Sequence, residues 1–299
     1  MQEQSIPTEL TTLARLFQKA GFSLYGVGGM VRNPLLGLPI SDMDIASGLR
    51  PEAVLALCKE NGLACVPKGI AFGMVEVHVG SLAFEHTTFR ADTYGPGGGH
   101  RPTAVHFSDT VEADAFRRDF TVNALYRDLT SGELIDPTGG LADLEAKLLR
   151  ATSPDPALIM GDDALRVMRL ARFAAELGFE AEQGTFQAAQ AHAGGLKDIS
   201  GERIRDELSK ILLADVKYGI ASPGAVYKGL ALLDALGALD VILPELTRGR
   251  GVAQRQQYHA FDVLGHCLHA ADAAEASGGL SLRLAALLHD VGKPVAMAK

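Results

Sequence analysis

The segment "YGVGGMVRNPLLGLPISDMDIAS", residues 25–47, places two adjacent glycines, one arginine and two aspartates within a single short unit. The apolar residues 22–27 predict a strand, and the glycine pair that follows predicts a turn without side chains. Residues 30–36 predict a short helix, in which Pro34 is tolerated because it lies in the first turn. The segment therefore predicts a strand, a glycine turn and a helix in direct succession.

This junction suits a phosphate group. Backbone amides of Gly28 and Gly29 can approach phosphate oxygens closely because no side chain intervenes. The guanidinium of Arg32 adds a planar fork of donors that matches the same oxygens. We therefore expect Gly28, Gly29 and Arg32 to bind the phosphates of a ligand.

The two aspartates predict a metal site. Asp42 and Asp44 are two positions apart, so both carboxylates point to one face if they lie on the next strand. Carboxylates held together repel one another unless a cation joins them, and Mg²⁺ favours carboxylate and phosphate oxygens. Two such ions could hold the attacking and leaving oxygens of an in-line displacement at phosphorus. A glycine turn followed by surface aspartates is the alternative for either motif alone, and their order favours the metal site.

Length and pattern predict two or more domains. The chain has 299 residues, of which 47% are hydrophobic, enough for a substantial core. Short β-branched runs dominate before residue 150, whereas apolar residues at helical spacing dominate after it. We expect an α+β head over 1–150, a helical body over 151–248 and a third helical unit over 249–299.

Composition also limits location and partners. No apolar run reaches the length of a membrane span and the N-terminus lacks the pattern of a signal peptide, so we expect a cytoplasmic protein with no membrane contact. The net charge of −8 argues against nonspecific coating of nucleic acid. The oligomeric state is not predicted.

The motif "RRDFTVNALYRD", residues 117–128, predicts ribose recognition. Arg117 and Arg118 offer donors to phosphate or ribose, and Asp119 and Asn123 share a face if the segment is helical. A carboxylate beside an amide can bind a ribose hydroxyl, and such a site rejects a deoxynucleotide by leaving its own polar groups unpaired. A surface salt-bridge cluster is the alternative.

The motif "GDDALRVMRLARF", residues 161–173, predicts base recognition. Asp163 and Arg166, at positions i and i+3 of an expected helix, could present an acceptor and a donor fork side by side. Cytosine and adenine both offer an amino donor beside a ring acceptor, whereas guanine and uracil present the opposite polarity. We expect this pair to accept C and A, with Arg169 and Arg172 holding template or phosphate. An intrahelical ion pair is the alternative.

In these motifs the chain resembles the bacterial-type class II tRNA nucleotidyltransferases, or CCA-adding enzymes, and the related bacterial poly(A) polymerases. The resemblance runs from about Leu24 to about Leu213. It implies a nucleotidyltransferase head with a polymerase-beta-like mixed sheet, followed by the helical body. It also implies that the glycine pair binds the incoming triphosphate and that Asp42 and Asp44 bind metal. Glu85 is the candidate for a third acid, with a cross-strand partner for a basic side chain as the alternative.

The resemblance further implies addition of C and A to the 3′ end of tRNA from CTP and ATP, with Mg²⁺ as cofactor and pyrophosphate as product. The base-reading segment resembles the family's EDxxR motif, with Asp162 in place of glutamate. Two departures limit what the resemblance implies. Asn33-Pro34 follows the arginine where relatives have aspartate, which bears on the orientation of Arg32. The loop "GGHRP" replaces "DGRRP", which keeps CC-adding, A-adding and poly(A)-adding variants open. Arg90 and Asp92 form an expected pair at the base of that loop.

The segments "FDVLGHCLHAA" and "LLHDVGKP" resemble an HD domain, in which His-Asp side chains bind a divalent metal. His266, His289 and Asp290 are the matching positions, and imidazole with carboxylate suits a transition metal. The sequence continues for nine residues after Asp290, so we expect a partial HD domain. The rival function is a metal-dependent HD phosphohydrolase with an RNA-binding head.

Overall fold

The computed structural model describes residues 6–93, 103–218, 223–254 and 260–297. Contacts divide the chain into two compact units, the first made of residues 1–146 with 150–155 and the second of residues 147–149 with 156–299. An α+β first unit and a helical second unit confirm the predicted fold class. The predicted domain boundaries stay predictions.

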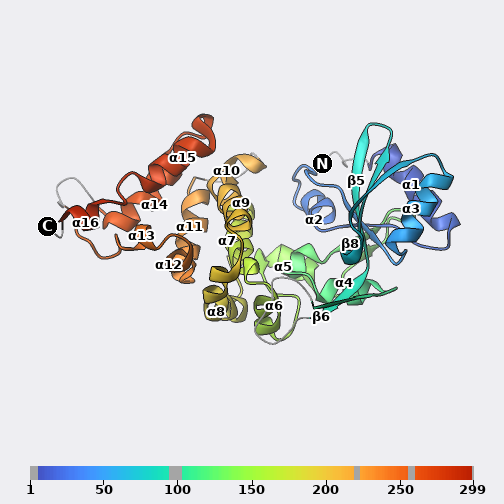
Figure 1. The fold of residues 1–299 in the computed structure, drawn as a ribbon, viewed down its shortest axis with the longest axis horizontal. Coiled ribbons are helices and arrows are strands. Elements are labelled where there is room, and N and C mark those ends of the chain that lie inside the picture. Colours follow the sequence, from blue (N-terminus) through green and yellow to red (C-terminus); the bar gives the residue numbers. More distant parts are fainter. Residues whose placement is uncertain (1–5, 94–102, 219–222, 255–259, 298–299) are drawn as a thin grey trace. The chain divides into compact units, whose positions relative to one another are not determined.

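The first unit is built around a seven-stranded mixed sheet in the order β3-β4-β5-β2-β1-β8-β9 (Figure 1). The pair β2–β5 is parallel and the other neighbouring pairs are antiparallel. A separate antiparallel pair is formed by β6 and β7. The strands are β1 (Tyr25–Val27), β2 (Asp44–Ser47), β3 (Ala64–Gly69), β4 (Met74–Val79), β5 (Leu82–Thr88), β6 (Arg90–Thr93), β7 (Ala104–Phe107), β8 (Tyr126–Asp128) and β9 (Leu134–Ile135).

Five α-helices and two short 3-10 helices accompany these strands among the described residues. They are α1 (Thr8–Lys19), α2 (Gly29–Leu35), α3 (Pro51–Glu60), η1 (Ile70–Phe72), α4 (Val111–Phe116), η2 (Thr121–Asn123) and α5 (Gly140–Ala146). Helix α1 buries Leu10, Leu13, Ala14 and Phe17, the i, i+3, i+4, i+7 spacing of one helix face. Together with α3, this face covers one side of the sheet (Figure 1).

Strand alternation decides which face of the sheet stays open. In β4, Val75, Val77 and Val79 are buried against α1 and α3. The intervening Glu76 and His78 therefore point to the opposite face. Near β1 and β8 that opposite face carries a second apolar cluster, which includes Tyr126. The charged side chains of β4 and β5 thus lie on the face that α1 and α3 do not cover.

The opening segment folds as a strand, a turn and a helix, with three corrections. The predicted strand over residues 22–27 is shorter, because β1 spans Tyr25–Val27. Pro34 lies in the last turn of α2, not in the first, because the helix already begins at Gly29. Asp42 lies before β2, which starts at Asp44, so the two aspartates do not share a strand.

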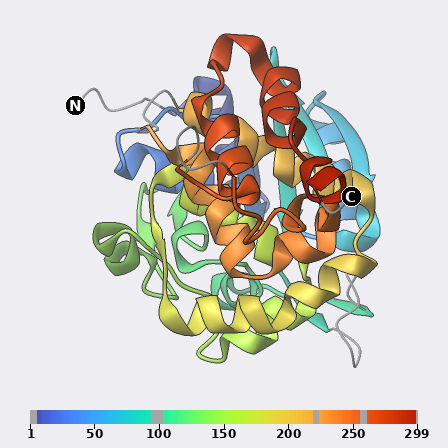
Figure 2. The same cartoon turned by 90° about the vertical axis from the view of Figure 1, so that its left-hand side faces the viewer.

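The second unit, green through red from residue 156 in Figures 1 and 2, is almost entirely helical. A two-residue parallel ribbon, β10 (Leu148–Leu149) with β11 (Glu180–Ala181), forms in this unit, where no strand was expected. The first helices are α6 (Pro156–Asp162), α7 (Leu165–Leu177), α8 (Gln183–His192), η3 (Ala193–Asp198), α9 (Gly201–Leu212) and α10 (Ala214–Lys217). The later ones are α11 (Ala225–Ala235), α12 (Ala238–Ile242), α13 (Pro244–Thr247), α14 (Val263–Ala273), η4 (Ala276–Gly278), α15 (Gly279–Leu288) and α16 (Lys293–Met297).

Helix α7 is the central element of the second unit, since nearly all of its side chains are buried. It packs against α9 and α11.

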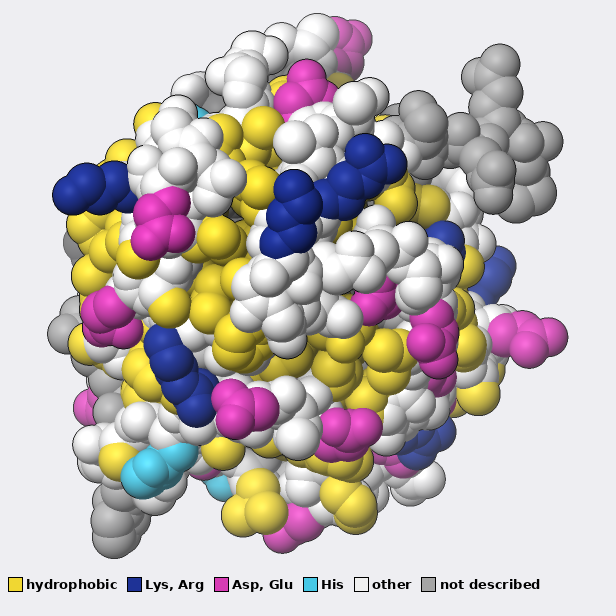
Figure 3. Space-filling view, turned by 90° about the vertical axis from the view of Figure 1, so that its right-hand side faces the viewer, with side chains coloured by type: hydrophobic (Ala, Val, Ile, Leu, Met, Phe, Trp, Pro, Cys, Tyr) yellow, Lys and Arg dark blue, Asp and Glu magenta, His cyan; other side chains and the backbone are white. Residues whose placement is uncertain are grey.

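On the side of the molecule shown in Figure 3, acidic and basic side chains are interspersed among apolar ones. Across the described ranges, the helices are too short or too polar to span a bilayer.

Candidate nucleotide and metal site

The glycine turn follows directly from the end of β1. Gly28 adopts φ 63° and ψ −126°, a conformation that a side chain would strain. Its N–H donates to the Leu125 carbonyl at 3.3 Å, and its carbonyl accepts from Arg32 N at 2.9 Å. Gly29 is the first residue of α2. The Gly28 N–H is thus used within the fold, which corrects its expected donation to phosphate, whereas the bare backbone at the Gly29 end of the turn suits a phosphate.

Arg32 requires a correction, because its guanidinium is not open to a ligand as expected. The residue is only 2% exposed. Its Nε and Nη2 donate to Asn33 Oδ1 at 3.1 and 2.8 Å, and its Nη1 donates to Asn123 Oδ1. The fork is thus held beneath the glycine turn by two amide oxygens.

Two of the predicted acids, Asp44 and Glu85, lie side by side on the open face of the sheet. Asp44 of β2 is paired in register with Glu85 of β5. Strands β1 and β2 pair Gly26 with Ile45. One step further along the same register, Val27, the residue before the glycine turn, is opposite Asp44. Asp42, Asp44 and Glu85 are all exposed. The strand that leads into the glycine turn, the strand of Asp44 and the strand of Glu85 are therefore adjacent.

The electrostatics of these acids favour a bound cation. Desolvation, followed by the negative charge of Asp44, raises the pKa of Glu85, and Glu76 and Asp42 act in the same direction. A carboxylate whose pKa is raised by neighbouring carboxylates gains free energy when a divalent cation joins it to them. Their all-oxygen donor set fits Mg²⁺. The role of Asp42, Asp44 and Glu85 as metal ligands stays a prediction.

Glu76, which the sequence analysis did not identify, extends this row of acids. It pairs in register with Glu85 on the neighbouring strand. Lys68 Nζ lies 3.2 Å from one of its carboxylate oxygens, and His78 Nε2 lies 3.0 Å from the other. The hydrogen bond from Lys68 lowers the pKa of Glu76. Side chains of a strand alternate between its two faces, so a charged residue between buried ones points to the open face. This pattern in the sequence could have identified Glu76.

The predicted ribose-binding pair forms, although not on an α-helix. Residues 121–123 form the 3-10 turn η2, and Asn123 Nδ2 donates to Asp119 Oδ1 at 3.0 Å. Both residues are 6% exposed. Asn123 also accepts from Arg32, so this pair is joined to the glycine turn.

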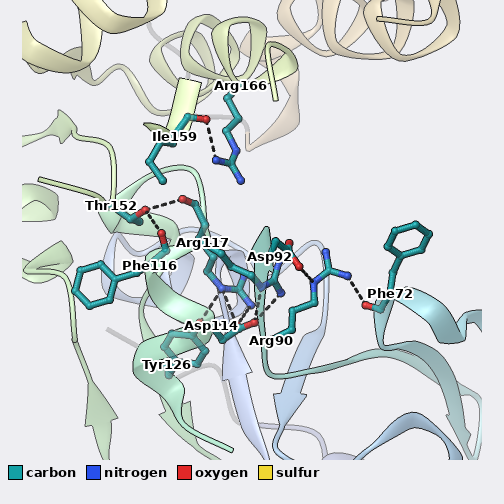
Figure 4. A network of polar contacts seen from close by, with 11 residues as sticks. Phe72, Arg90, Asp92, Asp114, Phe116, Arg117, Tyr126, Thr152, Ile159 and Arg166 are labelled. Atoms are coloured by element: carbon teal, nitrogen blue, oxygen red, sulfur yellow. Dashed lines mark hydrogen bonds and ion pairs between the residues drawn. The ribbon is translucent and has the colours of Figure 1, made fainter. Parts of the chain in front are cut away.

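The two arginines of the same motif converge on Asp114, which the sequence analysis did not identify. Figure 4 shows Asp114 with Arg117 and Tyr126. Asp114 is fully buried in α4. Arg117 Nη2 lies 2.6 Å from its Oδ1, and Arg118 Nη2 lies 2.8 Å from its Oδ2. The Tyr126 hydroxyl donates to the same Oδ2 at 2.7 Å. Two nitrogens of Arg118 bind Asp114, and the predicted contacts of Arg117 and Arg118 with phosphate or ribose stay predictions.

These donors also control the charge of Asp114. Burial alone would raise its pKa, but the guanidiniums of Arg118 and Arg117 and the hydroxyl of Tyr126 outweigh burial and lower the pKa to about 2. Asp114 is therefore a carboxylate at neutral pH. The sequence did carry its signal, since it stands three and four positions before the arginines, the spacing of helical neighbours.

The predicted pair at the base of the loop is present. Arg90 Nε lies 3.2 Å from Asp92 Oδ1, and Arg117 Nη1 lies 3.8 Å from Asp92 Oδ2. Arg90 also donates to the Phe72 carbonyl (Figure 4). The motif GGHRP itself, residues 98–102, lies outside the described residues.

In the second unit, Asp163 and Arg166 do not share a helix as expected. Asp163 lies between α6 and α7, where its Oδ1 accepts from Leu165 N at 3.0 Å. Its Oδ2 lies 2.8 Å from Arg203 Nη2 of α9, a partner 40 residues away that the sequence analysis did not identify. Arg166 is 9% exposed and donates to the Ile159 carbonyl at 2.8 Å.

The other arginines of α7 differ from one another. Arg172 is buried, and its Nε lies 2.8 Å from Glu207 Oε2 of α9. The expectation that Arg172 holds template or phosphate is therefore corrected, because its guanidinium is enclosed between helices. Arg169 lies over the ring of Phe173 and is partly exposed. Its predicted contact with a nucleotide stays a prediction.

The three residues of the HD-like segment lie together. Ligand atoms of His266, His289 and Asp290 all lie within 4.8 Å of one another. The two Nε2 atoms are 3.2 Å apart, and His289 Nε2 lies 3.1 Å from Asp290 Oδ2. Lys293 Nζ lies 2.6 Å from the same oxygen. Burial would raise the pKa of Asp290, but Lys293 and His289 outweigh it and lower the pKa.

Comparison with known proteins agrees with this geometry. Residues 24–150 match the model of the poly A polymerase head domain, and residues 178–249 match the probable RNA and SrmB-binding site of polymerase A. A CCA-adding enzyme of Streptococcus gordonii is 39% identical over 287 residues, covering 95% of this chain and 67% of the relative.

Solved structures are also similar. The CCA-adding enzyme of Bacillus stearothermophilus in complex with CTP aligns with a TM-score of 0.72 at 31% identity, covering 97% of this chain and 65% of that one. A tRNA nucleotidyltransferase with a primer tRNA and an incoming ATP analog aligns with a TM-score of 0.61 at 25% identity, covering 86% and 73%. The chain spans 52% to 67% of the length of the curated relatives it matches. The chain therefore belongs to the family of the CCA-adding enzymes and carries the head domain of the poly A polymerases.

Proposed function

We propose that the protein adds C and A nucleotides to the 3′ end of tRNA, with CTP and ATP as donors and pyrophosphate as the second product. The observation that carries this proposal is the arrangement of the bare Gly28–Gly29 turn beside Asp44, with Glu85 in register on the next strand. A phosphate-binding turn beside paired carboxylates suits transfer at phosphorus. The family membership supports the same chemistry.

In the proposed reaction the 3′ hydroxyl of tRNA attacks the α-phosphorus of the incoming nucleotide, and the bond to pyrophosphate breaks. Asp42, Asp44 and Glu85 would hold Mg²⁺, which supplies positive charge to phosphoryl oxygens when it is bound. The backbone amide of Gly29, at the start of α2, orients the triphosphate, and the bare backbone of Gly28 lets it approach closely. The protein contributes mainly positioning and electrostatic stabilisation.

Selection of the sugar is assigned to Asp119 and Asn123. Their shared hydrogen bond leaves a carboxylate and an amide close together in a nearly buried position, which a ribose hydroxyl can join. A deoxynucleotide would leave these groups without that partner. Selection of C and A over G and U is assigned to Asp163 and Arg166. C and A offer an amino donor beside a ring acceptor, whereas G and U present the opposite polarity.

The decisive test presents each nucleotide separately. Labelled CTP, ATP, GTP or UTP is supplied with Mg²⁺ and with tRNA ending at the discriminator base, at C or at CC. We expect CTP to extend the first two substrates and ATP to extend the third. Addition of A alone, of C alone or of long A tails would replace CCA addition with the corresponding variant. No incorporation on any tRNA would reject the proposed function.

The predicted cytoplasmic location stays a prediction.

We also propose that His266, His289 and Asp290 bind a divalent transition metal, because their ligand atoms converge and imidazole with carboxylate suits such ions. The cobalt(II) form should show the absorption bands of a nitrogen- and oxygen-ligated ion, and His266→Ala should abolish them. His192→Ala is the matched control, because His192 lies on α8 outside the cluster. Equal spectra for the native protein and His266→Ala would reject this metal site. Phosphoester hydrolysis by the metal-loaded protein would favour the rival HD function.

A further inference from the structure

Three aromatic rings form a stack in the second unit, where α11 packs against α14 (Figure 1). Tyr227 lies on α11, His269 lies on α14, and Phe261 stands shortly before the start of α14. The ring centroids of Tyr227 and His269 are 4.0 Å apart with 11° between the planes. Those of Phe261 and His269 are 4.1 Å apart with 28° between the planes. Two rings cannot lie on the same face of an imidazole at these distances, so His269 is the middle ring.

The two end rings of this stack differ in exposure. Tyr227 is half-buried, whereas Phe261 is 46% exposed although one of its faces lies on His269. The exposed area of Phe261 therefore belongs to its outer face and its rim. A single exposed phenylalanine is common on protein surfaces, but this one ends a row of parallel rings. A further flat ring could cover its outer face and continue the stack.

The backbone on both sides of the stack is held in place. Next to Phe261, the Oδ1 of Asp262 caps α14 by accepting from Gly265 N at 2.7 Å. The backbone of Gly265 lies close to the ring-bearing residue, since a Cβ there would be 3.2 Å from Phe261 Cβ. At the other end, Tyr227 N donates to Asp272 Oδ1 at 3.1 Å, which joins α11 to α14. The rings are thus positioned before any ligand arrives, which lowers the entropic cost of binding.

A nucleobase is a flat ring of suitable size for this position. Bases stack on aromatic side chains whatever their identity, because every base has a π face. Proteins reach the faces of RNA bases where the strand is unpaired, since paired bases are already stacked on one another. Stacking also needs no basic surface, which suits a chain with a net charge of −8.

We propose that Phe261 is a stacking platform for one unpaired base of bound RNA, with His269 and Tyr227 supporting it from behind. The choice of RNA as the ligand rests on the proposed function, in which tRNA is the substrate. The platform contributes to RNA binding and takes no part in the transfer step.

The test uses Phe261→Trp and Phe261→Ala in the full chain. The sequence contains no tryptophan, so Phe261→Trp introduces a single indole whose fluorescence reports a base stacked on it. The matched controls are Leu282→Trp and Leu282→Ala, because Leu282 of α15 is similarly exposed, at 43%, in the same unit.

The probe is a labelled single strand of oligoadenylate of about eight nucleotides, within the length that one single-strand site covers. An abasic strand of the same length and an RNA duplex are the comparison ligands. Fluorescence and anisotropy are recorded in EDTA without nucleoside triphosphate, so that neither proposed metal site is loaded.

We expect the fluorescence of Phe261→Trp to fall as the single strand is added, along the same binding curve as the anisotropy. Phe261→Ala should bind the single strand about tenfold more weakly than the native protein, the scale of one base stacked on an aromatic ring. The duplex and the abasic strand should leave the fluorescence of Phe261→Trp unchanged. Leu282→Trp should keep its fluorescence with every ligand, and Leu282→Ala should bind as the native protein does.

Equal affinity of the native protein and Phe261→Ala for the single strand would overturn the platform. Equal loss of fluorescence with the abasic strand would also overturn it, because the ligand would then be the phosphate backbone. If Phe261→Ala is destabilised, the fluorescence of Phe261→Trp decides the proposal, since that variant keeps an aromatic ring in the stack.

The binding measurement does not require turnover, so it separates this inference from the proposed function. A protein that binds the single strand through Phe261 but incorporates no nucleotide would reject the proposed function and support the platform. Nucleotide incorporation together with equal affinity of native and Phe261→Ala would reject the platform and leave the proposed function in place.

Discussion

Asp114→Asn tests whether the buried network around the two motif arginines stabilises the first unit. The side chain is fully buried and accepts from two guanidiniums and one phenol, with contacts between 2.6 and 3.1 Å. Its pKa falls from 3.8 to about 2, which corresponds to about 2 kcal/mol of stabilisation at neutral pH. An asparagine would also turn an NH₂ group toward one set of donors. We therefore expect a loss of about 3 kcal/mol, at the low end for a broken buried ion pair.

Hydrogen exchange resolved by peptide is the appropriate assay, because it reports the unfolding free energy of β1 and β8 separately from the second unit. Asp109→Asn is the matched control. Asp109 forms an exposed ion pair with Arg50 at 3.2 Å, and its loss should cost under about 1 kcal/mol. A loss under about 1 kcal/mol in Asp114→Asn would refute the reasoning.

The same variant predicts a change in acid stability. The folded-state pKa of Asp114 lies below the unfolded value of 3.8. Its contribution is therefore complete above pH 3.8 and is lost as the pH falls through about 2. Asp114→Asn should reduce the dependence of the unfolding free energy on pH within that window. An unchanged acid profile would show that other carboxylates dominate it.

The remaining predictions concern selectivity. Asp119→Ala should reduce the preference for CTP over dCTP by about 1–3 kcal/mol, as expected for an abandoned hydrogen bond, and unchanged discrimination would assign the pair to structure alone. Asp163→Ala should weaken use of CTP and ATP together and raise the relative use of UTP or GTP, whereas equal losses in kcat/KM for all four nucleotides would contradict base reading. Arg203→Gln should shift these ratios in the same direction if its ion pair orients Asp163. Arg205→Gln is the control, because Arg205 contacts only the exposed Asp206 among the ion pairs of the described residues.

Local patterns predicted much of the first unit. The glycine pair predicted the turn after β1, because only a residue without a side chain adopts φ 63° at Gly28 without strain. The spacing of Asp119 and Asn123 predicted that they would meet, and they do so even though the segment forms a 3-10 turn. Glu85 lies in register with Asp44, as a third acid on a neighbouring strand requires.

The sequence could not predict side-chain directions that depend on contacts between residues distant in the chain. Arg32 was expected to face a ligand, but its partner Asn123 stands 91 residues away and turns the guanidinium inward. The i, i+3 rule placed Asp163 and Arg166 on one helix, yet α7 starts after Asp163, which pairs with Arg203 instead. Side-chain direction in such cases depends on which elements pack together, and helical spacing alone does not contain that information.

The most direct test of the central claim compares single-turnover incorporation of labelled CTP by the native protein and by Asp44→Asn. The substrate is tRNA ending at the discriminator base, and tRNA affinity is measured in the same samples. The proposed metal role predicts that Asp44→Asn loses at least about a hundredfold in rate, the scale of removing a group that stabilises transition-state charge, with tRNA affinity within a few-fold of native. Near-native incorporation by Asp44→Asn would contradict the claim that nucleotidyl transfer takes place at these acids.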